Sequence, residues 1–246
     1  MKNLKFGILS ALCLLTLLTA GCATNGDSAT NAFKNSSAKQ IFVGGETALA
    51  KADYATAIKH FEALDSLYPF GDEAKQAKID IIYAYYKNDD YAPALAAADR
   101  YIHLYPRDAV VPYVYYMKGI VGLESNRTVL QKFYNSNLAE LDLSSLRGSF
   151  STFNELVQQF PDSIYAKDAH RRMIYIRNTL AEHELQTANF YFERKAYVAA
   201  INRAIYVVKH LNGSPQVTKA LQLMQKSYQA LGEQKKASDI TQLLKK

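Results

Sequence analysis

Histidine and cysteine are the residues of this 246-residue chain best suited to metal binding or nucleophilic chemistry. The chain has two cysteines and five isolated histidines: His60, His103, His170, His183 and His210. His183 and Glu184 match the start of a zinc-protease helix motif, but Thr187 stands where that motif needs its second histidine. No G-x-S-x-G turn and no glycine-rich phosphate loop occurs. The sequence therefore predicts a protein that is not an enzyme, with no metal site and no cofactor.

A second group of polar residues is better suited to binding. In the segment 196–205, a helical stripe of apolar residues recurs at spacings of three and four: Tyr197, Ala200, Ile201, Ala204 and, just beyond, Val208. At about 100° per residue, Arg203 lies off that stripe, on a flank with Ala199, Tyr206 and His210. An exposed arginine is commonly just solvated, although arginine beside tyrosine is enriched in interface hot spots. The spacing alone does not decide whether Arg203 is solvated or contacts a partner.

Tyrosine, with 18 copies, predicts a further binding surface. A groove is expected on the first helices of two repeats, from Ile79, Tyr83, Tyr86 and Lys87 in one and Tyr113, Tyr116 and Ile120 in the next. Such a groove suits an extended peptide that carries aromatic side chains and a free carboxylate. The alternative for any one of these tyrosines is packing between repeats.

Internal repeats predict the elements that position these residues. The segments 53–69 and 90–106 align without a gap at a period of 37, and looser copies occur at 150–161, 196–212 and 233–246. Two helices per unit, small residues such as Ala57, Ala94 and Ala200 at the crossings, and a proline after the second helix resemble the tetratricopeptide repeat. We expect an all-α solenoid of about five helix pairs. The approximate repeats are 39–71, 72–108, 109–163, 164–213 and 214–246, with an insertion at 124–145 in the third.

The N-terminal segment predicts export and lipid attachment. Residues 1–21 combine a positive start with an apolar run that is too short to span a membrane, and "LLTAGC" resembles the bacterial lipoprotein cleavage motif ending at Cys22. A plain signal peptide with an incidental cysteine is the alternative. The polar segment 22–38 is expected to be a flexible tether, and 39–246 the repeat domain. Removing the signal lowers the formal net charge of +6 without leaving a basic stripe, so no nucleic-acid partner is expected.

Several of these segments together resemble the BamD family, the tetratricopeptide lipoproteins of the β-barrel assembly (Bam) machinery in Gram-negative outer membranes. The resemblance is carried by "LYPFG" (67–71), "IDIIYAYYKNDD" (79–90), "YVYYMKGI" (113–120), "AYVAAINR" (196–203) and Cys22. It implies a non-enzymatic scaffold anchored by lipid to the periplasmic face of the outer membrane.

The resemblance also implies roles for individual residues. The family docks its C-terminal repeats onto the last periplasmic POTRA domain of BamA, so Arg203 would meet an acidic patch there, together with Asn202, Tyr206 and His210. The N-terminal repeats are implicated in receiving unfolded outer-membrane proteins, which places Tyr68, Phe70 and Gly71 near the substrate end of the groove. Other Bam lipoproteins are further expected partners.

Two departures from the family pattern concern partner contacts. The segment "NLAELDLSSLRGS" (137–149) is less charged than is usual in the family, and the fourth repeat ends in "HLNGSP" rather than Tyr-Pro. The other function that we consider is that of a tetratricopeptide lipoprotein that binds peptidoglycan or cell-wall synthases.

Overall fold

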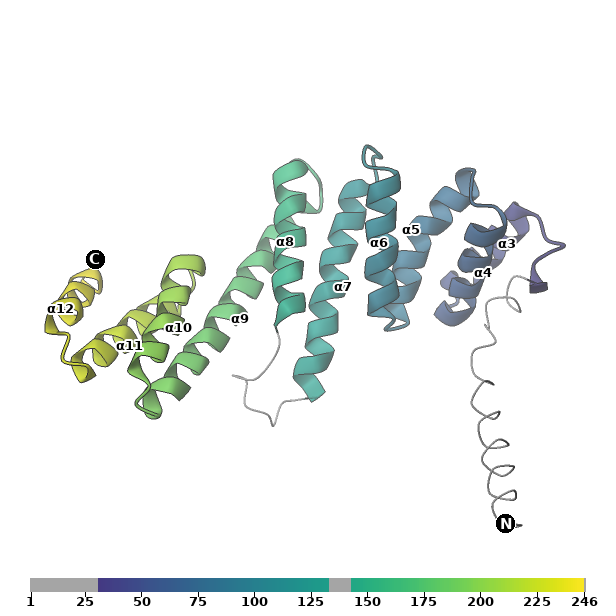
Figure 1. The fold of residues 1–246 in the computed structure, drawn as a ribbon. Helices are drawn as coiled ribbons and strands as arrows, with labels where there is room; N and C mark the ends of the chain where they lie inside the picture. Colours follow the sequence, from purple (N-terminus) through teal and green to yellow (C-terminus); the bar gives the residue numbers. More distant parts are fainter. Residues whose placement is uncertain (1–30, 133–142, 246) are drawn as a thin grey trace, which may run out of the picture. The chain divides into compact units, whose positions relative to one another are not determined.

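The computed structural model describes residues 31–132 and 143–245, and every regular element within them is a helix. The predicted signal segment 1–21, Cys22 and part of the expected insertion lie outside the described residues. Five consecutive helix pairs follow one another along the chain (Figure 1). They are α3 (Ala38–Ala50) with α4 (Tyr54–Leu67), α5 (Asp72–Lys87) with α6 (Tyr91–Leu104), α7 (Val111–Lys132) with α8 (Ser144–Gln159), α9 (Ala166–Glu193) with α10 (Tyr197–His210), and α11 (Val217–Ala230) with α12 (Gln234–Leu243). The expected all-α fold of about five helix pairs is confirmed.

The chain forms two compact units that divide between Ala77 and Lys78, inside α5. In the first unit α3 packs against α4, with Phe61 and Leu64 of α4 fully covered. A Cβ atom on Gly45 would lie 2.5 Å from the Phe61 ring. Glycine at this position therefore lets the two helices approach closely. A single domain over 39–246 stays a prediction.

The end of the expected tether is attached to the first unit. The Phe33 ring lies 4.7 Å from the His60 ring, and the Tyr68 hydroxyl donates a hydrogen bond to the Ser36 carbonyl (2.9 Å). Ser37 caps α3 by accepting a hydrogen bond from the Gln40 backbone N–H, which satisfies an otherwise unpaired donor. These contacts tie residues 33–37 to α3 and α4, and the flexible tether over 22–38 stays a prediction.

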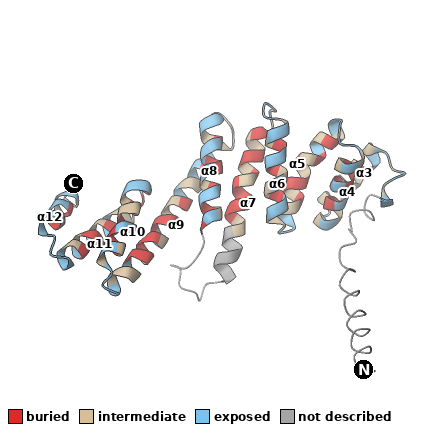
Figure 2. Cartoon of the chain, in the orientation of Figure 1, coloured by how far each residue is buried: buried red, intermediate tan, exposed pale blue. Residues whose placement is uncertain are grey.

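The second unit has one continuous core that extends from Ile79 to Ile240. From α6 to α12 each helix packs on the next, and α9 also contacts α11. Figure 2 shows buried residues along α7 and α9 of this unit. The alanines predicted at helix crossings in this unit, Ala94 and Ala200, are fully covered. Small side chains at these two positions leave room for neighbouring helices to pack closely.

One turn recurs between the helices of four of the five pairs. It places a residue with positive φ before the second helix, at Ala52, Asp89, Lys195 and Gly232. Two of these intervals, 52 to 89 and 195 to 232, span the 37 residues of the sequence repeat. In each turn the backbone N–H of the following residue donates to the carbonyl five positions earlier, as Asp53 does to Ala48 and Ala196 to Tyr191. The repeat is therefore visible in the backbone as well as in the sequence.

The fourth pair ends differently from the first three. Pro69, Pro106 and Pro161 each stand two residues after a helix end, where a proline cannot continue the helix. After α10, which ends at His210, Asn212 stands at this place. Gly213 follows with φ +76°, and a Cβ on it would meet the guanidinium of Arg177 on α9 at 2.8 Å. A left-handed glycine beside an arginine thus follows α10, with no proline at the position that it occupies after the first three pairs.

The packing between α7 and α8 gives a stability prediction. A Cβ on Gly119 would lie 2.4 Å from the fully buried Phe153 ring, so Gly119→Ala should lower the free energy of unfolding by about 1–3 kcal/mol. Gly148→Ala is the matched control, because Gly148 is in α8 and a Cβ added there would meet open space. This substitution should raise the free energy of unfolding by about 0.5–1 kcal/mol. Urea unfolding followed by circular dichroism measures both. Equal effects of the two substitutions would contradict the close packing.

Candidate functional site

The outward face of α10 carries the predicted docking residues. The buried stripe of this helix consists of Ala200, Ile201, Ala204 and Val207. Asn202, Arg203 and His210 are exposed and Tyr206 is half-buried. The predicted position of Arg203 off the stripe, on a flank with Tyr206 and His210, agrees with this exposure. The rings of Tyr206 and His210 lie 4.8 Å apart. This face is available to solvent or to a partner.

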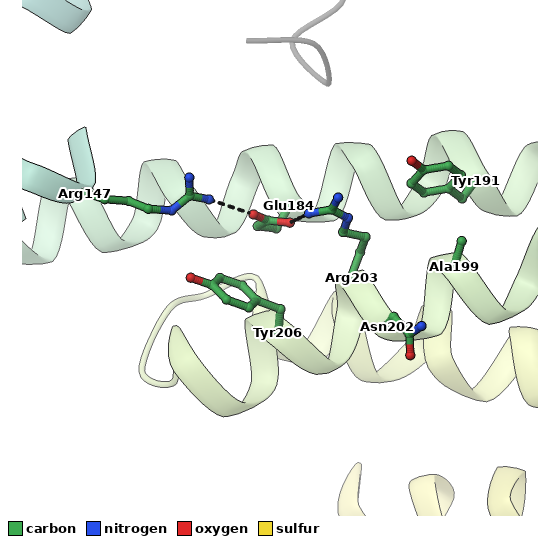
Figure 3. Close-up of a pocket in the computed structure, with 7 residues that line it drawn as sticks. All are labelled: Arg147, Glu184, Tyr191, Ala199, Asn202, Arg203 and Tyr206. Atoms are coloured by element: carbon green, nitrogen blue, oxygen red, sulfur yellow. Dashed lines mark hydrogen bonds and ion pairs between the residues drawn. The ribbon is translucent and has the colours of Figure 1, made fainter. Parts of the chain in front are cut away.

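Arg203 also has a partner within the chain, which the sequence did not predict. Its Nη1 donates to Oε2 of Glu184 on α9 at 3.2 Å, and Nη2 of Arg147 on α8 donates to Oε1 of the same carboxylate at 3.0 Å. Figure 3 shows Glu184 between the two guanidinium groups. The Glu184 side chain is 3% exposed, whereas those of Arg147 and Arg203 are 45% and 49% exposed. A carboxylate removed from water in this way requires such partners.

The three charged residues line a pocket of about 610 Å³. Its remaining lining residues are Tyr191, Ala199, Asn202 and Tyr206. Helices α8, α9 and α10 each contribute to it, and Figure 3 shows Asn202 and Tyr206 on the same helix as Arg203. A small pocket that has two half-exposed arginines and tyrosines around it is suited to an acidic group on another protein.

One feature of the sequence could have indicated the role of Glu184. It lies among Ala181, Leu185 and Ala188 on the buried stripe of α9, where an isolated carboxylate is unusual. Such a residue requires a cation from elsewhere in the fold. The sequence does not indicate which cation, because Arg147 is 37 residues away and on another helix.

The tyrosines expected to line a groove are brought together in part. Tyr113 and Tyr116 of α7 lie 5.8 Å and 5.1 Å, ring to ring, from Tyr165, which caps α9. On α5, the Tyr83 and Tyr86 rings are 6.4 Å apart. All five are half-buried and pack against the core, and Lys87 is exposed at the end of α5. Tyr165 was not predicted.

Two residues expected in the groove are in the core instead. Ile79 is 6% exposed and Ile120 is 8% exposed, so neither lines an open surface. The prediction for both is wrong because these apolar side chains are packed into the hydrophobic core of the second unit. Tyrosine, with a longer side chain and a polar tip, extends from the same face of α5 towards solvent.

An ionic cluster lies next to these tyrosines. The Asp168 carboxylate accepts hydrogen bonds from the Tyr116 hydroxyl (2.8 Å), Arg172 Nε (2.6 Å) and Arg171 Nη2 (2.7 Å). Burial opposes ionisation of Asp168, but the three hydrogen bonds outweigh it and hold its pKa at about 2. Burial, with Asp80, Tyr165 and Tyr83 nearby, raises the pKa of Tyr113 to about 12. At neutral pH the surface therefore combines neutral tyrosines with a fixed carboxylate and two arginines.

The remaining predicted residues belong to the first unit and are described there by themselves. Tyr68 is 36% exposed, and its hydroxyl is held by Ser36. Phe70 is 88% exposed, which is unusual for a phenylalanine. Gly71 follows with φ +106°, a conformation that favours glycine, and α5 begins at the next residue. Phe70 is therefore presented to solvent at a sharp turn.

In the described part of the chain, no three His, Cys, Asp or Glu residues are grouped so as to hold a metal ion. Within 31–132 and 143–245, no helix has both the length and the apolar character needed to cross a bilayer.

The successive helix pairs define a helical-repeat protein, with the arginine pocket between α8, α9 and α10 and the tyrosine cluster on α5 and α7. The family model YfiO, described as an outer membrane lipoprotein, matches residues 34–243. The chain belongs to this family, and the predicted family membership is confirmed.

Similar proteins carry the same name in several bacteria. The chain is 38% identical over 229 residues to "Outer membrane protein assembly factor BamD" of Vibrio cholerae, covering 93% of each chain. It is 32% identical over 234 residues to the protein so named in Haemophilus influenzae, covering 95% of this chain and 88% of that one. These names do not favour the cell-wall alternative. A solved tetratricopeptide repeat protein from Parabacteroides merdae also matches, with 14% identity, a TM-score of 0.32, and coverage of 85% of this chain and 97% of that one.

The Asp168 cluster predicts a dependence of stability on pH. Because the folded-state pKa of about 2 lies below the ordinary 3.8, the cluster stabilises the fold above about pH 4 and loses this effect as the pH falls towards 2. Asp168→Asn should therefore be less stable than the parent at neutral pH by up to about 2 kcal/mol, and the difference should shrink on acidification.

Urea unfolding between about pH 7 and pH 3 measures this difference. Asp162→Asn, which removes an exposed carboxylate just before α9, is the control and should follow the parent throughout. A difference between Asp168→Asn and the parent that does not change with pH would mean that the hydrogen bonds to Asp168 do not favour its ionised form.

Proposed function

We propose that this protein is a non-catalytic scaffold of the Bam complex that helps to receive and insert unfolded outer-membrane proteins. The observation that carries the proposal is the match of the outer membrane lipoprotein family to residues 34–243, together with relatives named as outer membrane protein assembly factors. Helix pairs that expose two separate binding surfaces agree with a scaffold role.

The docking partner in this proposal is the last POTRA domain of BamA, which contacts the outward face of α10. Arg203 supplies a half-exposed cation, and Asn202 and Tyr206 share its pocket. His210 lies beside the Tyr206 ring and extends this surface along α10. Aromatic and arginine side chains around a small pocket are typical anchors of protein interfaces. Other Bam lipoproteins are further proposed partners.

The substrate in this proposal is an unfolded outer-membrane protein in extended form. Tyr83, Tyr86, Tyr113 and Tyr116 offer aromatic contact area, and Lys87 offers a cation for a carboxylate. In the first unit, the exposed Phe70 and the neighbouring Tyr68 and Gly71 offer a second aromatic contact. Apolar aromatic surface of this kind suits a chain that has not yet buried its own aromatic residues.

The membrane attachment in this proposal is a lipid on Cys22, which lies outside the described residues. The family description as an outer membrane lipoprotein supports a lipid anchor, and the sequence before Cys22 supports cleavage there. The thioether-linked lipid and the acylated amino group together give the two signals that stable anchoring requires. The protein would then lie at the periplasmic face of the outer membrane.

In-cell photo-crosslinking tests the docking face. A photoreactive residue at position 202 leaves the Arg203–Glu184 ion pair intact while placing the probe in the same pocket. The expected result is a dominant adduct with the POTRA region of BamA, identified by mass spectrometry, because Asn202 lies beside the proposed contact.

A probe at Asn154 is the control, because this residue is exposed on α8 and does not line the pocket. It should give no such adduct. Equal labelling of BamA from both positions, or adducts from position 202 with cell-wall synthases instead, would count against the proposed function.

A further inference from the structure

The pocket beside α10 has an unbalanced charge. It contains two guanidinium groups, of Arg147 and Arg203, and one carboxylate, of Glu184. Each oxygen of Glu184 accepts a hydrogen bond from a different arginine, so a single negative charge is shared by two positive ones. The local net charge is +1, which one further carboxylate would neutralise.

The arginines keep donors available for such a group. A guanidinium has five N–H donors, and the hydrogen bond to Glu184 uses one from each arginine. Nearly half of each arginine side chain is exposed, whereas Glu184 is almost fully covered. An incoming anion would therefore meet the arginines and not the glutamate.

Glu184 fixes where these donors lie. Arg147 comes from α8 and Arg203 from α10, and the only described acidic group that contacts both is Glu184 on the intervening α9. Without it, two long cationic side chains at this spot would repel each other and lose their common orientation. Ordering such side chains before binding lowers the entropy lost on association.

We propose that Arg147 and Arg203 together bind one acidic side chain of the docking partner, and that Glu184 is the positioning residue that holds both arginines. This inference rests on the proposed docking of α10, and it adds a second cation from the preceding helix pair. A carboxylate fits better than a phosphate, because its single charge balances the site and the tyrosines around the pocket suit a protein surface.

Binding kinetics of the purified mature protein with the last POTRA domain of BamA from the same organism test the inference. Arg147→Ala and Arg203→Ala should each weaken the affinity by about tenfold or more. Each substitution removes one of the two arginines that bind the acidic side chain of the POTRA domain. Arg107→Ala is the matched control, because it removes an exposed cation from the loop after α6, and it should bind like the parent.

Glu184→Gln separates positioning from folding. It raises the local charge to +2, so the association rate at low salt should be unchanged or faster, while dissociation should be about tenfold faster because the arginines are no longer held. A variant that is only partly folded would lower the active fraction and leave the dissociation rate unchanged. Arg147→Lys keeps the positive charge but not the planar guanidinium. Compared with Arg147→Ala, it should restore the association rate and only part of the lifetime of the complex.

The outcomes distinguish this inference from the proposed function. If the parent binds and Arg203→Ala weakens binding, but Arg147→Ala and Glu184→Gln bind like Arg107→Ala, the inference is overturned and the docking face remains. If the parent does not bind the POTRA domain at all, the proposed docking fails and the inference fails with it.

Discussion

The burial of one carboxylate, that of Glu184, determines how the surface beside α10 is built. An ionised group with 3% of its side chain exposed is stable only if its charge is compensated, and here two arginines from different helices do so. This requirement joins α8, α9 and α10 at one point. It also brings two arginines together at the surface, each with N–H donors that its hydrogen bond to Glu184 does not use. A site for an acidic side chain of a partner needs such donors.

Helix α9 carries a second carboxylate that is held in a similar way. Asp168 is in the first turn of α9, 16 residues before Glu184, and binds Arg171, Arg172 and the Tyr116 hydroxyl. The same long helix therefore carries the anchoring acid of the arginine pocket and that of the tyrosine cluster. Because each acid is fixed on a packed helix, its arginines start from a defined position and not from a flexible loop.

The repeat pattern was enough to predict the helices, since the period of 37 and the proline after the second helix of the first three pairs are local signals of the chain. The outward position of Arg203 also followed from helical spacing alone. Glu184 with Arg147, and Asp168 with Tyr116, could not be predicted because each pair joins residues 37 and 52 positions apart on separate helices. Ile79 was misplaced for a related reason: helical spacing gives the face of a residue, whereas its exposure depends on the side chains that neighbouring helices place over it.

The most direct test of this account is a double-mutant cycle for folding stability with Arg147→Ala, Arg203→Ala and the double variant. Each single variant leaves Glu184 one arginine and should cost on the order of 1 kcal/mol, whereas the double variant leaves a buried carboxylate unpaired and should cost about 3–5 kcal/mol. The loss of stability in the double variant is therefore expected to exceed the sum of the two single losses. Additive losses would mean that the two arginines do not share Glu184, and would contradict this account.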